Sequence, residues 1–165
     1  SITAVHLPRG GMPALGDNPL FLGCADYRST IASNAESSGF TFPEEMGRYA
    51  DKGTALVTDK DPGDAEIAEV VSQAAAHSCI VLGTYNGHIL QGQLRLAKAL
   101  AATGLPMILV ALRNPYDLRN MPDHVATLAG WEYTRPLFDA LWPVLNGTAR
   151  PTGKLPLLTL TKAAE

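Results

Sequence analysis

From about residue 53 onward, short apolar runs alternate with stretches of helical periodicity. This alternation is typical of βαβ units, in which helices cover both faces of a parallel sheet. The apolar runs are short and continuous, as expected for strands buried on both sides. They predict strands at Leu20–Cys24, Thr54–Thr58, Cys79–Gly83, Met107–Leu112 and Val125–Ala129. The sequence therefore predicts an α/β fold, a flavodoxin-like three-layer sandwich with a mainly parallel sheet of about five or six strands.

Four helices are predicted from capping residues and apolar stripes. The first is a short helix over residues 43–49, with Thr41 or Phe42 before it. The second opens at Asp61-Pro62-Gly63-Asp64, with a carboxylate at its N-cap and proline in its first turn. Its predicted core face consists of Ile67, Val70, Val71, Ala74 and Ala75.

The third predicted helix ends at Gly104, and the fourth begins near Thr134 and ends at Asn146-Gly147. Pro143 lies inside the fourth and is expected to kink it or to shorten its last turn. The predicted buried stripes are Leu90, Leu94, Ala97 and Ala101 in the third helix and Leu137, Phe138, Leu141, Val144 and Leu145 in the fourth. The segment Gly153-Lys154 is expected to turn into a final strand.

Length and charge narrow the class of protein. A chain of 165 residues fits one domain, residues 1–165, and buries roughly 70% of its unfolded surface. The net charge is -3 and lysine and arginine are scattered singly, which argues against a nucleic-acid partner. No apolar run approaches the ~20 residues of a membrane span. Because the chain starts at Ser1 without Met, we expect a processed protein or a fragment of a longer one.

Neither a metal nor a cofactor is indicated by a motif. Cys24 and Cys79 lie in apolar runs, which predicts two buried thiols and leaves the compartment open. The four histidines show no metal-ligand spacing. The glycine patterns of dinucleotide and P-loop sites are absent, so we expect no nucleotide cofactor.

Candidate site residues follow the predicted strands, because ligands of open α/β sheets bind beyond the carboxyl ends of the strands. These loops are rich in aromatic, amide and charged side chains, a lining that suits a sugar ring and its hydroxyls. The same residues could equally have only structural roles. The candidates are Tyr85, Asn86, His88, Arg113, Asn114, Tyr116, Asp117, Trp131 and Glu132.

Acidic residues are missing from a long central stretch, since no Asp or Glu lies between Glu69 and Asp117. Cleavage of a glycosidic bond normally requires two carboxyl groups about 5 to 10 Å apart. Asp117 and Glu132 are the acids nearest the remaining central loops, and the sequence does not set their separation. We therefore do not expect this chain to carry out such a cleavage by itself.

Four segments have a distinctive sequence: Ile80–Gly83, Pro106–Asp117 with its Leu-Arg-Asn-Pro-Tyr-Asp ending, Pro136–Leu141, and Asn146-Gly147 followed by Pro151-Thr152-Gly153-Lys154-Leu155-Pro156. Together they resemble the C-terminal α/β-sandwich domain of glycoside hydrolase family 3, most closely its β-N-acetylhexosaminidase branch. The resemblance extends over about residues 68–158, and Ser1–Val5 is similar to the segment by which such a chain enters this domain. For this chain the resemblance implies no assignable catalytic residue.

This resemblance implies a parent enzyme that hydrolyses terminal N-acetylglucosaminides with retention. In that family a separate (β/α)8 barrel carries the nucleophilic aspartate, and in the hexosaminidase branch also a His-Asp acid/base pair. The β-glucosidase branch takes a glutamate from the loop after the third strand of the second domain, but here that loop, Thr84–Gln91, contains none. The implied partners are the barrel of the same enzyme and a carbohydrate substrate at the domain boundary.

Two other readings stay open at this point. The chain could be a stand-alone module that binds a carbohydrate or another small ligand through its strand-end loops. It could also be a flavodoxin-like binder of phosphate or nucleotide, although the glycine loop for that role is missing.

Overall fold

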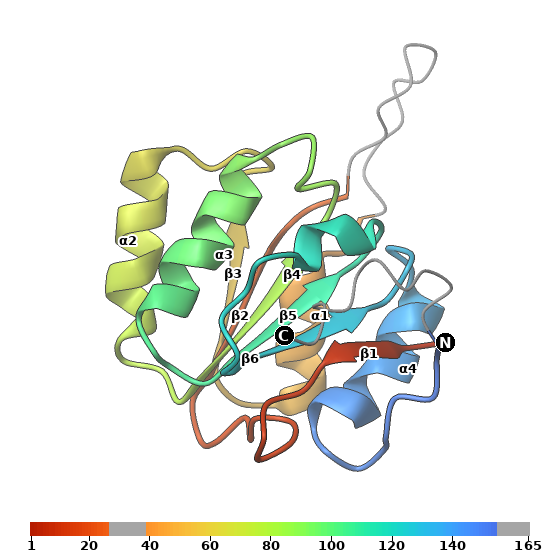
Figure 1. Ribbon diagram of the computed structural model, residues 1–165. Helices are drawn as coiled ribbons and strands as arrows, with labels where there is room; N and C mark the ends of the chain where they lie inside the picture. The colour runs from red at the N-terminus through yellow and green to blue at the C-terminus, as the bar shows by residue number, and fades with distance from the viewer. Residues whose placement is uncertain (27–38, 155–165) are drawn as a thin grey trace, which may run out of the picture.

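The computed structural model describes residues 1–26 and 39–154 and contains one six-stranded sheet (Figure 1). The strand order is β1-β6-β5-β4-β2-β3, and only the pairing of β1 with β6 is antiparallel. The strands are β1 (Thr3–His6), β2 (Pro19–Cys24), β3 (Thr54–Thr58), β4 (Cys79–Thr84), β5 (Met107–Ala111) and β6 (Val125–Ala129). The predicted α/β class and mainly parallel sheet are confirmed.

Helices cover both faces of this sheet and complete a three-layer sandwich. Helices α1 (Phe42–Ala50) and α4 (Arg135–Leu145) pack on one face, and α2 (Asp64–Ala74) and α3 (Gly92–Ala102) on the other. The connection from β5 to β6 contains only a short 3-10 helix, η1 (Pro115–Leu118). Among the described residues, no helix is long and apolar enough to span a bilayer.

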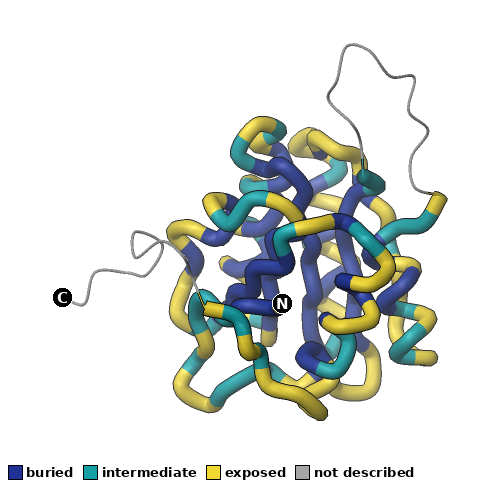
Figure 2. The backbone as a smooth tube through the Cα atoms, turned by 90° about the vertical axis from the view of Figure 1, so that its right-hand side faces the viewer, coloured by how far each residue is buried: buried dark blue, intermediate teal, exposed yellow. Residues whose placement is uncertain are grey.

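Alternate residues of each central strand enter opposite cores. In β2, Phe21 faces α1 and α4, whereas Leu20 and Leu22 face α2 and α3. Strands β2, β4, β5 and β6 are buried along their whole length, and Figure 2 shows this buried backbone running through the middle of the molecule. Burial on both faces explains why these strands are continuous apolar runs in the sequence.

The beginning of the second predicted helix was wrong. Helix α2 begins at Asp64 after Gly63 and not at Asp61-Pro62. Asp61 instead caps a different helix: its Oδ1 accepts a hydrogen bond of 2.8 Å from the amide of Gly92 at the start of α3. A Cβ at Gly92 would lie 2.4 Å from the Pro62 carbonyl oxygen, so only glycine permits this approach. The predicted core face of α2 was also too wide, since Val71 is only partly buried and Ala75 is exposed.

The predicted stripe of α3 was partly wrong as well. Ala97 and Ala101 are buried as expected, but Leu90 and Leu94 are only partly buried. The buried face instead consists of Gly92, Gln93, Leu96, Ala97, Leu100 and Ala101. A polar glutamine occupies the core stripe because its amide bonds the preceding turn, a tertiary role that hydrophobic periodicity does not reveal.

Strand β1 was not among the predicted strands. It pairs antiparallel with β6, with an irregular register between Ala4 and His6, and most of it is only partly buried. Half-buried edge strands carry a weaker apolar signal than central ones. The final strand expected after Lys154 lies outside the described residues.

Helices α1 and α4 agree with their predictions. Thr41 caps α1, and the buried residues of α4 are the five predicted ones. Pro143 lies inside α4, which ends soon afterwards at Leu145, and the amides of Thr148 and Ala149 both bond the Pro143 carbonyl. The carbonyl of Asp139, which a non-proline residue at 143 would have bonded, belongs to an exposed residue that water can reach.

Gly83 in β4 allows α1 to pack close to the sheet, and this generates a test. A Cβ at this position would lie 2.5 Å from Phe42 Cδ1 and 2.8 Å from Leu112 Cδ1, inside a fully packed core. We expect Gly83→Ala to lower the free energy of unfolding by about 1–3 kcal/mol, because overpacking forces side chains and backbone to shift. Gly10→Ala, where nothing lies within 4 Å, is the matched control. Equal urea midpoints for the two variants would contradict the close packing of α1.

The two free cysteines predict a loss of stability in alkali. Burial raises the pKa of the Cys24 and Cys79 thiols from 9.0 to about 12. Above pH 9 the unfolded chain releases thiol protons that the folded chain keeps, so stability is complete below pH 9 and falls as pH rises toward 12. The slope is at most about 1.4 kcal/mol per pH unit for each cysteine. Thermal unfolding between pH 9 and 11 should show a shallower slope for the Cys24→Ala/Cys79→Ala variant; identical slopes would contradict it.

Candidate functional site

The loops that follow β4 and β5 lie together at the carboxyl edge of the sheet (Figure 1). The loop after β4 is fixed first by Gln93, whose Oε1 accepts from the Tyr85 amide at 2.8 Å and whose Nε2 donates to the Tyr85 carbonyl at 2.9 Å. Asn86 then turns the chain with a left-handed φ of 56°, and its carbonyl accepts from the amides of Ile89 and Leu90. This loop therefore has a defined shape before any ligand binds.

Asp117 ties the loop after β5 to the loop after β4. Asp117 is only 1% exposed. Its two carboxylate oxygens accept hydrogen bonds from the amides of Gly87 at 2.9 Å and His88 at 2.8 Å. Asn114 caps η1 by accepting from the Tyr116 amide at 3.0 Å, which sets the position of Asp117. A Cβ at Gly87 would lie 3.2 Å from Asp117 Cγ, so the glycine leaves room for the carboxylate.

His88 is held between these two loops. Its Nδ1 lies 3.4 Å from Asp117 Oδ1, close enough for electrostatic attraction but not aligned as a hydrogen bond. On the other side Nε2 lies 3.4 Å from Asn114 Nδ2. The side chain is one-third exposed, so one edge of the ring faces solvent. The arrangement orients an imidazole beside a buried carboxyl group, and the solvent-facing edge of the ring can contact a ligand.

Tyr85 and Arg113 form a second contact within the cluster. The guanidinium donates to the Tyr85 hydroxyl at 2.8 Å and lies 5.6 Å from its ring centroid. The Tyr85 ring is only 6% exposed and meets Tyr133 edge-on at 5.4 Å. Its faces are therefore part of the core, and among the candidates from these two loops Tyr116, 41% exposed, is the aromatic ring that a ligand can reach.

Trp131 and Glu132 form no hydrogen bond or ion pair with the residues of this cluster. Trp131 has a left-handed φ of 74° and packs against the core under α2 and α3. Glu132 is exposed and has no hydrogen bond or ion pair to any described residue. Asp117 is buried, and both of its carboxylate oxygens accept hydrogen bonds from backbone amides.

Some important residues of this edge were missed by sequence reasoning. Gln93 and Tyr133 position the loops; the Tyr133 hydroxyl accepts from the Phe42 amide at 2.7 Å and donates to the Cys24 carbonyl at 3.0 Å. Burial raises the pKa of Tyr133, which keeps the hydroxyl protonated. A polar residue inside an apolar helical stripe was the one available signal for Gln93.

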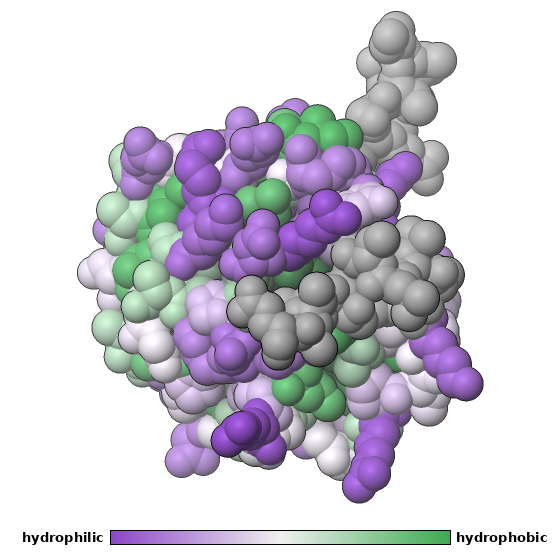
Figure 3. Space-filling view, viewed as in Figure 1, coloured by the Kyte–Doolittle hydropathy of each residue, from purple (hydrophilic) through white to green (hydrophobic). Residues whose placement is uncertain are grey.

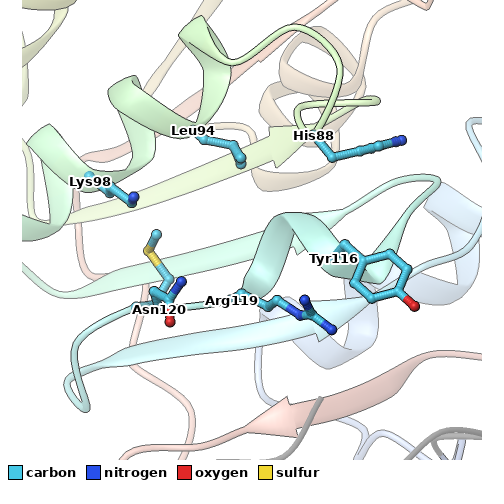
Figure 4. A pocket seen from close by; sticks show the side chains of 7 residues that line it. His88, Leu94, Lys98, Tyr116, Arg119 and Asn120 are labelled. Atoms are coloured by element: carbon cyan, nitrogen blue, oxygen red, sulfur yellow. The ribbon is translucent and has the colours of Figure 1, made fainter. Parts of the chain in front are cut away.

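A pocket opens beside the cluster, between α3 and the segment that follows β5 (Figure 4). His88 and Tyr116 reach it from the candidate loops, whereas Lys98 and Arg119 were not predicted. Within residues 1–26 and 39–154, no group of three His, Cys, Asp or Glu side chains could hold a metal ion.

The bonding of Asp117 leads to a prediction. In Asp117→Asn the amide nitrogen of the new side chain cannot accept, so the Gly87 or the His88 amide loses its acceptor. We expect a loss of about 1–3 kcal/mol in unfolding free energy, with faster hydrogen exchange at one of these two amides. Glu132→Gln, an exposed carboxylate without a described partner, should change stability by no more than about 0.5 kcal/mol. Unchanged exchange at both amides in Asp117→Asn would contradict the assignment.

Comparisons with known proteins give structural neighbours only. No protein-family model matches the sequence, and no curated protein matches it either. Among solved structures, a glycoside hydrolase family 3 β-N-acetylglucosaminidase from Paenibacillus sp. str. FPU-7 superposes with a TM-score of 0.81 at 23% identity. The match covers 99% of this chain but only 31% of the Paenibacillus enzyme.

Two further neighbours belong to the same family. A fungal multi-domain β-N-acetylglucosaminidase matches 94% of this chain and 17% of its own, with a TM-score of 0.71 and 20% identity. A β-glucosidase from Listeria innocua matches 94% of this chain and 25% of its own, with a TM-score of 0.68 and 17% identity. The chain thus has the fold of one segment of glycoside hydrolase family 3 enzymes and spans at most about a third of the length of these three.

Proposed function

We propose that this chain is the accessory, non-catalytic C-terminal domain of a family 3 glycoside hydrolase. The observation that carries the proposal is the coverage: nearly the whole chain matches the Paenibacillus enzyme, while about two-thirds of that enzyme has no counterpart here. On this proposal the catalytic carboxylates belong to a (β/α)8 barrel of the same enzyme.

The chemistry of the strand-end cluster supports an accessory role. Glycosidic hydrolysis uses two carboxyl groups about 5 to 10 Å apart, one of them free to exchange a proton. The carboxylate held within the cluster is Asp117, and both of its oxygens accept backbone hydrogen bonds. Glu132, the other acidic candidate, is exposed and has no hydrogen bond or ion pair to any described residue.

The substrate class proposed for the parent is terminal N-acetylglucosaminides. The two β-N-acetylglucosaminidases superpose with TM-scores of 0.81 and 0.71, against 0.68 for the β-glucosidase. The loop after β4 also lacks the glutamate expected of the β-glucosidase branch. We place the substrate at the domain boundary, next to the solvent-facing edge of His88 and the exposed ring of Tyr116.

A stand-alone module for small ligands is the second candidate, and the pocket beside His88 favours it. Calorimetry separates the two functions. A stand-alone carbohydrate-binding module should bind N-acetylglucosamine. An accessory domain whose sugar site is formed mainly by the barrel should show no heat of binding for that sugar.

The accessory role predicts that the chain does not hydrolyse 4-nitrophenyl N-acetyl-β-glucosaminide. The rate of nitrophenol release should equal that of buffer, because on this proposal the catalytic carboxylates belong to the barrel. Glu132→Gln and Asp117→Asn, assayed in parallel, distinguish the chain from a contaminating enzyme. Turnover that co-purifies with the chain and falls in either variant would contradict a non-catalytic role.

A further inference from the structure

The pocket between α3 and the segment after β5 combines positive charge with an apolar lining. Its volume is about 310 Å³, at the lower end of the range for sites that hold small organic ligands. Leu94 and Lys98 reach it from α3, and Tyr116, Arg119 and Met121 reach it from the opposite wall (Figure 4). His88 lies at the end of the pocket nearest the strand-end cluster.

Both cations of this pocket are unneutralised within the described parts of the chain. Lys98 and Arg119 have no ion pair there, and no Asp or Glu lines the pocket. No Asp or Glu occurs in the sequence between Glu69 and Asp117, although the whole chain carries a charge of -3. Asp117, the nearest acid in the sequence to Arg119, is buried against two amides. A localised positive pocket on an acidic protein favours an anionic ligand.

Aromatic and apolar side chains lie beside these two cations in the pocket. The Arg119 guanidinium carbon lies 4.3 Å from the Tyr116 ring centroid, so cation–π stacking holds the arginine in place. A stacked guanidinium keeps its in-plane N–H groups for an anion, while the Tyr116 residue remains 41% exposed. Figure 3 shows hydrophilic side chains over α3 and η1 with hydrophobic surface between them, as a ring-bearing ligand would require.

We propose that this pocket binds a small organic anion of hexose size, such as a sugar phosphate or a sugar carboxylate. Lys98 and Arg119 pair with the anionic group, and Tyr116, Leu94 and Met121 contact the ring. The small volume and the two cations suit a single small molecule and not a nucleic-acid backbone, which needs an extended row of positive charges. The proposal does not depend on the accessory role, because every group that it uses belongs to this chain.

The test is a titration of the full chain followed by amide NMR shifts, with four probes. Glucose 6-phosphate and glucuronate carry the ring together with the anion, glucose carries the ring alone, and inorganic phosphate the anion alone. We expect one or both of the ring-bearing anions to shift the amides of Leu94, Lys98 and Met121 and to bind about tenfold or more tightly than glucose and phosphate. The stronger of the two identifies the anionic group. The proposal would be overturned if neither glucose 6-phosphate nor glucuronate binds. It would also be overturned if inorganic phosphate binds as strongly as both of these ring-bearing anions.

Variants then locate the site. Lys98→Gln and Arg119→Gln should each weaken binding of the stronger probe by about tenfold. Arg95→Gln is the matched control, because Arg95 lies on the same helix and is exposed but does not line the pocket. Equal weakening by all three variants would mean diffuse surface attraction and would overturn the site. Both test residues are exposed, so loss of folding does not confuse the result.

Discussion

The buried carboxylate of Asp117 is the interaction on which the candidate site depends. Its oxygens hold the amides of Gly87 and His88, and so they join two loops that belong to different strands. A hydrogen bond to a charged group contributes about 1.5–3 kcal/mol, and a buried carboxylate without such bonds would be strongly unfavourable. One residue therefore explains why the two loops keep a fixed arrangement.

The topology of the sheet explains where the pocket lies. Helix α3 covers the sheet beside β4 and β5, but the next connection on that face supplies only η1. A full helix there would pack against α3 and fill the space that the pocket occupies. Lys98 and Arg119 can reach this space because α3 and the segment after η1 form its two walls. The short crossover thus leaves a recess with two cations and an apolar lining where other α/β units have a helix.

Sequence reasoning succeeded where burial and local capping decide the structure. Strand Val125–Ala129 was predicted with its observed bounds, and α4 with its buried residues, because a buried apolar run and a threonine cap act locally. Strand Thr54–Thr58 was also predicted with its observed bounds, although it is mostly exposed at the edge of the sheet. It failed where a tertiary contact competes with a local signal. Asp61 looks like an N-cap but bonds Gly92 across 31 positions, and Gln93 occupies a core stripe to hold Tyr85.

The candidate site shows the same division. The sequence directed attention to the loops after β4 and β5, and the structure places both at the carboxyl edge of the sheet. It could not show that Tyr85 and Asp117 point inward while His88 and Tyr116 keep solvent contact. Lys98 and Arg119 carry no sequence signal of their own. The fold places Lys98 on α3 and Arg119 after η1, so that both line one pocket.

The central claim is that the residues performing glycosidic chemistry lie on another domain. Retaining glycosidases form a covalent glycosyl ester on a carboxylate, and an activated fluoro-sugar of the N-acetylglucosamine type traps that ester. The intact mass of the chain after incubation with such a reagent tests the claim most directly. The account predicts an unchanged mass. A single glycosyl adduct, formed stoichiometrically and mapped to an Asp or Glu of this chain, would contradict it.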